Sequence, residues 1–193
     1  MEQYYPLPLD DYYNNNGFSY DLEQRIGNFT TFGSSYPGDE IPDQKDLIIE
    51  DIPFLFPEAK STFNNIELEN QRLSVPEHHY TAMSILGAAD NGSYDENVEY
   101  HLNDTLVHRM PLALTNWTDQ MPKYNEKVVY RCSGIYTQKG SLLTSKQTTI
   151  WLQTIQFEHP IHINAIVLPD NPCMHLFAIT LKKENTNEHA TTI

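Results

Sequence analysis

The strongest strand candidate in the 193-residue chain is Met174-His175-Leu176-Phe177-Ala178-Ile179-Thr180-Leu181. Side chains in a strand alternate between its two faces. The two expected faces are Phe177, Ile179 and Leu181 on one side and Leu176, Ala178 and Thr180 on the other. Both faces are largely apolar, and a strand of this kind is covered on both sides. This stretch therefore predicts a strand in the interior of a β-sandwich.

Further strands are expected before this stretch. Residues 98–102 alternate between apolar and polar side chains, and residues 149–157 and 165–168 have strand-like composition. Residues 47–49 and 53–56 flank Glu50-Asp51, which predicts a hairpin with a tight turn.

One segment, residues 80–89, is compatible with a short helix by propensity and with a buried strand entering a turn. The content of 12 Tyr, 8 Phe and 12 Pro favours short strands and turns over long helices. Several short strand candidates separated by turn residues are typical of a sandwich or jelly roll. We therefore expect an all-β protein, an antiparallel β-sandwich of the jelly-roll kind.

The length predicts one structural domain. Residues 1–45 are rich in Tyr, Asn, Asp, Gly and Pro without a sustained period, so they form either a disordered arm or an ordered loop system. Their aromatic content favours an irregular segment that packs on the sandwich. Residues 46–183 then form the sandwich, and residues 184–193 form a flexible C-terminal tail.

The formal net charge is −14, from 26 acidic and 12 basic residues. A nucleic-acid partner needs a basic surface, and an anionic membrane attracts basic segments, so neither partner is expected. Acidic side chains commonly solubilise a surface. They leave open a structural Ca²⁺, but no EF-hand spacing is present, and we predict no cofactor.

The two cysteines, Cys132 and Cys173, are too few for a disulfide framework. The N-terminus has no basic region followed by an apolar region, and no apolar run approaches the length of a membrane span. These features predict a cytoplasmic protein, or a secreted one if a signal has been removed from the chain.

Catalytic motifs are missing from the sequence. It contains no Gly-x-Ser-x-Gly, His-Glu-x-x-His or paired Cys-x-x-Cys motif and no Gly-rich phosphate loop. His78-His79 and His159-x-x-His162 have no acidic or sulfur ligand at a spacing that is telling for a metal site, so we predict no metal site. An enzyme that uses His175 or Arg131 with a nearby carboxylate is the weakest of the functional hypotheses.

Binding chemistry is better represented. Sugars are recognised by aromatic faces, amides, carboxylates and arginine. Groups of this kind occur in three places: Asn14, Asn15, Asn16 and Asp21 among Tyr12, Tyr13, Phe18 and Tyr20; Asn116, Trp117 and Asp119; and Tyr130 with Arg131. The most informative arrangement would gather Asn15, Arg131 and Trp117 around one concavity.

An ordered series of motifs resembles a family of galactose-binding-like β-sandwich modules, which are appended to bacterial and fungal glycoside hydrolases. The motifs are Tyr12-Tyr13-Asn14-Asn15-Asn16-Gly17-Phe18-Ser19, Ile52-Pro53-Phe54-Leu55-Phe56-Pro57, Leu86-Gly87-Ala88-Ala89-Asp90-Asn91-Gly92, Leu114-Thr115-Asn116-Trp117, Val129-Tyr130-Arg131 and residues 174–181. The resemblance covers nearly the whole chain and implies a jelly roll, no catalytic centre and a ligand site in the loops at one end. It also makes residues 80–89 a strand. Asn116 departs from the family, which more often carries Asp there.

Together these features predict a non-catalytic module that binds a carbohydrate or another small polar ligand. The predicted ligand-binding residues are Asn14, Asn15, Asp21, Trp117, Tyr130, Arg131 and His175. The alternative is a protein-interaction or self-assembly domain, including a homo-oligomer.

Overall fold

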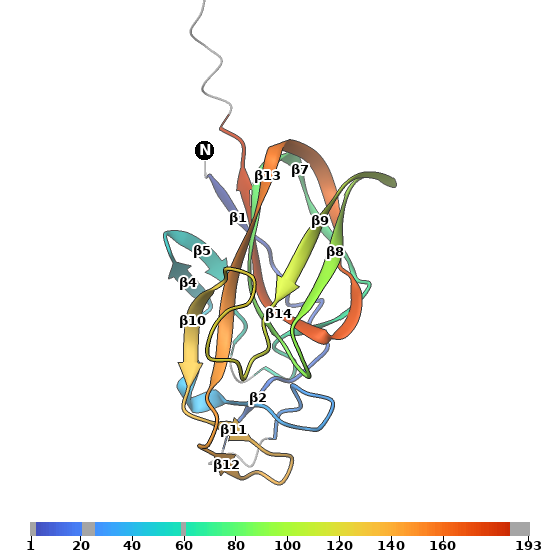
Figure 1. Cartoon of the computed structure of the whole chain (residues 1–193). Coiled ribbons are helices and arrows are strands. Elements are labelled where there is room, and N and C mark those ends of the chain that lie inside the picture. Colours follow the sequence, from blue (N-terminus) through green and yellow to red (C-terminus); the bar gives the residue numbers. More distant parts are fainter. Residues whose placement is uncertain (1–2, 21–25, 59–60, 186–193) are drawn as a thin grey trace, which may run out of the picture.

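The computed structural model describes residues 3–20, 26–58 and 61–185. Nearly all of its regular structure is β-strand, as Figure 1 shows. The elements are β1 (Tyr4–Pro6), β2 (Phe18–Ser19), β3 (Tyr36–Pro37), the 3₁₀ turn η1 (Gly38–Glu40), β4 (Asp46–Ile49), β5 (Ile52–Leu55), β6 (Ile66–Glu69), β7 (Arg72–Ala89), β8 (Tyr94–Leu102), β9 (Thr105–Leu114), β10 (Lys127–Cys132), β11 (Ile135–Tyr136), β12 (Leu142–Leu143), β13 (Thr148–Val167) and β14 (Asp170–Lys183).

The main sheet has eight strands in the order β1-β14-β7-β13-β8-β9, with β10 paired to β13 and β6 paired to β14. All these pairs are antiparallel. The two long strands β7 and β13 arch together over one end of the molecule (Figure 1). Their pairing shifts register between Gln156 and Ile161. Side chains from both halves of each strand enter the same core, so one half of each strand belongs to one layer and the other half to the second layer. The sheet thus folds into two layers, which confirms the predicted all-β antiparallel sandwich.

The ambiguous segment, residues 80–89, is part of strand β7 and pairs with both β13 and β14. The predicted hairpin is also confirmed, because β4 and β5 pair across Glu50 and Asp51. Both turn residues have positive φ, 52° and 62°, which matches the tight type I′ connection of two-residue hairpins.

A first hydrophobic core lies between the layers. It contains Leu176, Ile179 and Leu181 of β14, with Ile85 of β7 and Tyr100 of β8, all of which are fully buried. Because such large apolar side chains each contribute roughly 1.5–3 kcal/mol when buried, this core supplies much of the stability of the sandwich.

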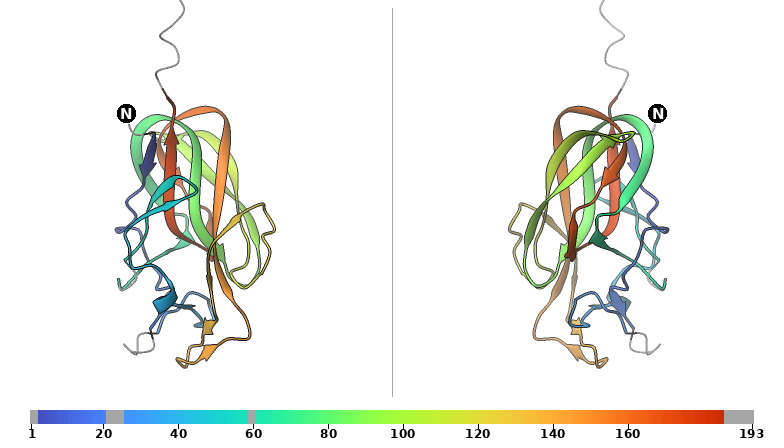
Figure 2. Two further views of the ribbon diagram at one scale, coloured as in Figure 1. Left: turned by 90° about the vertical axis from the view of Figure 1, so that its left-hand side faces the viewer. Right: turned by 90° about the vertical axis from the view of Figure 1, so that its right-hand side faces the viewer.

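A second core covers the outside of the sheet. The segment between β1 and β6 runs down one side of the folded sheet (Figure 2) and presents its aromatic rings to it. Phe18 stacks on Phe177 at a centroid distance of 5.5 Å, and Phe29 lies 6.1 Å from the same ring. The described part of the Tyr- and Asn-rich N-terminal segment is therefore packed on the outer face of the sheet. This packing explains why β14 is apolar on both faces.

Strict alternation fails within β14. Phe177 was expected on the same face as Ile179 and Leu181, but it packs with Ala178 in the second core. The pairing with β7 shifts register between Leu176 and Ala178, and a β-bulge of this kind changes which residues share a face. The predicted face assignment was wrong at Phe177, and also at Leu176, which lies in the first core with Ile179 and Leu181, for this reason.

Two predictions fall partly or wholly outside the described residues. Asp21 is one, and most of the predicted C-terminal tail is the other, since the described chain ends at residue 185.

Both cysteines are free thiols, and Cys132 is buried. Within the described ranges, no helix is long and apolar enough to cross a membrane.

Candidate ligand-binding site

Several loops meet at the end of the sandwich away from the arch of β7 and β13, where β2, β11 and β12 lie in Figure 1. They are residues 27–35, the β7–β8 turn at 90–93, the β9–β10 loop at 115–126 and the β10–β13 connection at 133–147. These loops come from distant parts of the sequence, and together they form the candidate site.

The first wall is the tight loop from Thr30 to Ser34. Backbone hydrogen bonds close it, from Thr30 N to Ser34 O (3.0 Å) and from Gly33 N to Thr30 O (2.8 Å). The Thr30 hydroxyl accepts hydrogen bonds from the amides of Phe32 and Ser34. Gly33 has a φ of 75°, which favours glycine. This closed loop holds the Phe32 side chain outward, with 74% of it exposed.

Trp117 forms the floor. Its backbone amide donates to Ala89 O (2.8 Å), and its carbonyl accepts from Thr149 N (2.7 Å), so the residue is fixed to the ends of β7 and β13. Its ring lies against Phe29 and Tyr36, with centroid distances of 5.0 and 4.9 Å. Only 4% of Trp117 is exposed. The second core therefore supports one side of the indole, and the other side borders the site.

Amides from two turns complete the site. Asn91 adopts a φ of 55° and donates from Nδ2 to the Thr31 hydroxyl (3.0 Å). Asn116 Oδ1 accepts hydrogen bonds from the amide and hydroxyl of Thr118 (3.0 and 3.1 Å). The Asn116 amide is thus engaged within its own loop, whereas the Asn91 amide links the β7–β8 turn to the Thr30–Ser34 loop.

Asp90 anchors the Phe32 loop from beneath. This buried carboxylate accepts a hydrogen bond from Thr31 N (3.3 Å), and burial raises the pKa of its carboxyl group. Its Oδ1 is buried with no hydrogen-bond partner in the described part of the chain. Asp90 therefore contributes to the position of the loop and offers no exposed charge to the site.

Glu126 fastens the loop that carries Trp117. It is 5% exposed, and its carboxylate accepts hydrogen bonds from Thr115 N (2.6 Å), the Thr115 hydroxyl and Tyr124 N (3.2 Å). Hydrogen bonds to a charged acceptor are stronger than neutral ones. Glu126 therefore ties the two ends of residues 115–126 together, and the buried Thr115 hydroxyl accepts a further hydrogen bond from Lys123 N (2.8 Å).

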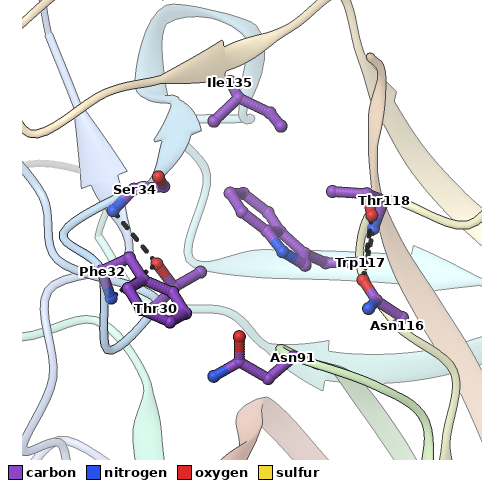
Figure 3. Close-up of a pocket in the computed structure, with 8 residues that line it drawn as sticks. All are labelled: Thr30, Phe32, Ser34, Asn91, Asn116, Trp117, Thr118 and Ile135. Atoms are coloured by element: carbon purple, nitrogen blue, oxygen red, sulfur yellow. Dashed lines mark hydrogen bonds between the residues drawn. The ribbon is translucent and has the colours of Figure 1, made fainter.

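Together these loops line an open pocket of about 230 Å³. Figure 3 shows the Trp117 ring in the middle, with Phe32 and Thr30 on one side and Asn116 and Thr118 on the other. Its lining residues are Thr30, Phe32, Ser34, Asn91, Asn116, Trp117, Thr118 and Ile135. The pocket combines aromatic surface with hydroxyl and amide groups, and none of its lining side chains is titratable.

Asn14 and Asn15 lie elsewhere, in a hydrogen-bonded amide cluster. Asn14 exchanges hydrogen bonds with the backbone of Glu67, and its Nδ2 also reaches Glu69. The buried Asn15 donates to Asn28 O and Glu67 Oε2 and accepts from Asn65. Both side chains tie the N-terminal segment to β6, and neither lines the pocket.

His175 belongs to the same cluster. It is 1% exposed, its Nδ1 lies 2.9 Å from Asn65 Oδ1, and its ring packs on Phe29 at 4.1 Å. Asn65 Nδ2 donates to Asn15, which leaves Asn65 Oδ1 to accept from His175. Burial lowers the pKa of His175 to about 3, so the ring is neutral at pH 7.

Tyr130 and Arg131 lie on β10, away from the pocket. Tyr130 is half-buried and its ring meets Phe56 edge-on at 6.1 Å. Arg131 is exposed and donates to Gln120 O (2.9 Å). Of the three residues whose convergence was sought, only Trp117 lines the pocket; Asn15 and Arg131 do not.

Sequence reasoning missed Phe32 as a site residue. The available signal was Thr30-Thr31-Phe32-Gly33-Ser34, in which an aromatic residue stands inside turn chemistry. An aromatic side chain at a polar turn has little core to pack against and is often exposed for binding.

Neither His175 nor Arg131 has a carboxylate hydrogen-bond partner among the described contacts. The described residues also contain no group of three or more His, Cys, Asp or Glu side chains arranged to hold a metal ion.

Comparison with curated proteins gives no match. A family match does exist, and it extends over residues 2–185, nearly the whole chain. The description of that family agrees with the two-layered antiparallel fold described above. The chain belongs to the AziU2-like beta-sandwich domain family.

Proposed function

We propose that this protein is a non-catalytic binding module that recognises a carbohydrate or another small polar ligand in the Trp117 pocket. One observation carries the proposal: separate loops bring Phe32 and Trp117 together with amide and hydroxyl groups around one hollow. Concave sites with aromatic walls and a few polar groups are typical ligand sites. The resemblance of several motifs to galactose-binding-like modules adds support, since those modules bind through loops at one end.

The composition of the pocket supports binding over catalysis. Acid–base or nucleophilic chemistry needs titratable or nucleophilic groups held within hydrogen-bond reach of each other. The lining described above offers only amides, aliphatic hydroxyls and apolar groups. Its threonine and serine hydroxyls have no histidine or carboxylate beside them among the lining residues.

The test is a calorimetric titration with a panel of monosaccharides and small polyols, using the wild type and Phe32→Ala. We expect binding to the wild type and a Kd raised roughly fivefold in the variant, because aromatic contacts contribute about 1 kcal/mol. Phe32 is 74% exposed, so its removal costs little stability.

The matched control is Phe63→Ala, which removes another exposed ring, 48% exposed and outside the pocket. It should bind as the wild type does. An equal loss of affinity in both variants, or no binding of any panel member to the wild type, would count against the proposal.

A second candidate function, protein interaction or self-assembly, is favoured by the apolar rim of the same loops. Ile26, Leu142 and Leu143 are 48%, 40% and 49% exposed. Leu142 and Leu143 form β12, which pairs with β11, the strand that carries the pocket residue Ile135. Exposed apolar side chains gathered in one place often mark interfaces. Sedimentation at increasing protein concentration tests self-assembly: a shift from monomer to oligomer that Leu143→Ser removes would favour it.

A further inference from the structure

We propose that the Trp117 pocket takes one uncharged pyranose ring and rejects charged sugars. The inference rests on the proposed function and narrows its ligand class. Charge, hydrogen-bonding capacity, aromatic surface and size each support it.

The first argument is charge. No lining side chain is titratable, so a bound carboxylate, phosphate or ammonium group would find no opposite charge in the pocket. Burying an unpaired charge is costly. The net charge of −14 adds a repulsive field for anions. Asp90, the carboxylate nearest in sequence to Asn91, is buried beneath the loop, so it cannot receive a ligand cation.

The second argument is hydrogen bonding. Asn116 uses its oxygen within the loop, which leaves its Nδ2 group to donate. Asn91 uses its nitrogen, which leaves its Oδ1 to accept. The Thr30 hydroxyl accepts from two backbone amides and keeps its proton to donate, whereas the Thr118 hydroxyl donates to Asn116 and can accept. A mixed set of donors and acceptors matches sugar hydroxyls, which both donate and accept.

The third argument combines shape and size. Phe32 stands exposed at the edge of the hollow, where its face can cover the C–H surface of a sugar ring (Figure 3). The pocket volume, about 230 Å³, lies below the range of roughly 300–1,000 Å³ typical of sites for drug-sized ligands. It therefore suits a single ring, either a monosaccharide or the last unit of a chain.

The experiment measures binding of matched probes by calorimetry or saturation-transfer NMR. The neutral probes are the methyl glycosides of glucose, galactose and mannose. The charged probes are methyl glucuronide, methyl galacturonide, glucose 6-phosphate and methyl glucosaminide. We expect at least one neutral glycoside to bind and its charged counterpart to bind roughly tenfold more weakly or worse, since the charge is left unpaired.

Asn116→Asp is the matched variant. Asp is nearly isosteric and keeps an oxygen to accept from Thr118, so the turn is retained. It adds one negative charge to the lining. In this variant the affinity for methyl glucosaminide should rise relative to that for methyl glucoside. The affinity for the uronides should fall relative to that for the neutral glycosides.

The outcomes separate the two proposals. If a uronide or glucose 6-phosphate binds as tightly as the neutral glycoside, and Phe32→Ala weakens that binding, the neutral-ligand inference is overturned and the proposed function stands. If no sugar probe binds, the pyranose inference is overturned, and the proposed function is overturned as well only if the small polyols of its panel do not bind either.

Discussion

His175 is a histidine kept neutral by burial, and this sets an expected pH dependence. Its pKa is about 3 in the folded protein, against an ordinary value of 6.5. Between these values the unfolded chain binds a proton that the folded chain does not. The stability associated with His175 is therefore complete above pH 6.5 and falls as the pH is lowered through this window, by about 1.4 kcal/mol per pH unit.

Urea unfolding of the wild type and His175→Gln at pH 7.0, 5.5 and 4.5 measures this effect. Gln can still donate toward Asn65 Oδ1 but does not titrate. The wild type should lose more stability than the variant as the pH falls. His108→Gln, which removes an exposed histidine, is the control. If the free energy of unfolding depends on pH equally in the wild type and His175→Gln, His175 does not have the lowered pKa given above.

The loop between β9 and β10 depends on Glu126 for its shape. Glu126→Ala leaves the amides of Thr115 and Tyr124 without their acceptor, and a buried unsatisfied group costs about 1–3 kcal/mol. We expect a lower melting temperature, faster hydrogen exchange in residues 115–126 and weaker ligand binding. Because Gln keeps one acceptor oxygen, Glu126→Gln should fall between alanine and the wild type. Wild-type exchange rates in Glu126→Ala would exclude this role.

Sequence patterns predicted elements better than they predicted faces or site geometry. Periodicity and turn residues located the β4–β5 hairpin and the interior position of β14. They missed the bulge at Phe177, because a register shift depends on the facing strand β7 and not on local sequence. Trp117 was predicted as a site residue and lines the pocket, but Phe32 was not, since its neighbours come from loops distant in the chain.

The N-terminal segment is expected to be part of the folding unit. Phe18, Phe29 and Tyr36 are almost fully buried against the sheet, and Phe29 and Tyr36 also support Trp117. Each buried aromatic ring contributes roughly 1.5–3 kcal/mol, whereas a whole domain is stable by about 5–15 kcal/mol. Removal of residues 1–45 should therefore abolish cooperative folding.

Near-ultraviolet circular dichroism and thermal melting of residues 46–193 test this expectation. The truncated chain should lack a sharp transition and aggregate, because Phe177 and Trp117 become exposed. A milder series separates packing from chain length: Phe29→Ala should cost about 3–5 kcal/mol, and Phe29→Leu clearly less, because leucine leaves a smaller cavity. If residues 46–193 melt cooperatively near the wild-type temperature, the second core does not hold the sandwich together. The pocket would still need the N-terminal segment, through Phe32 and the rings beneath Trp117.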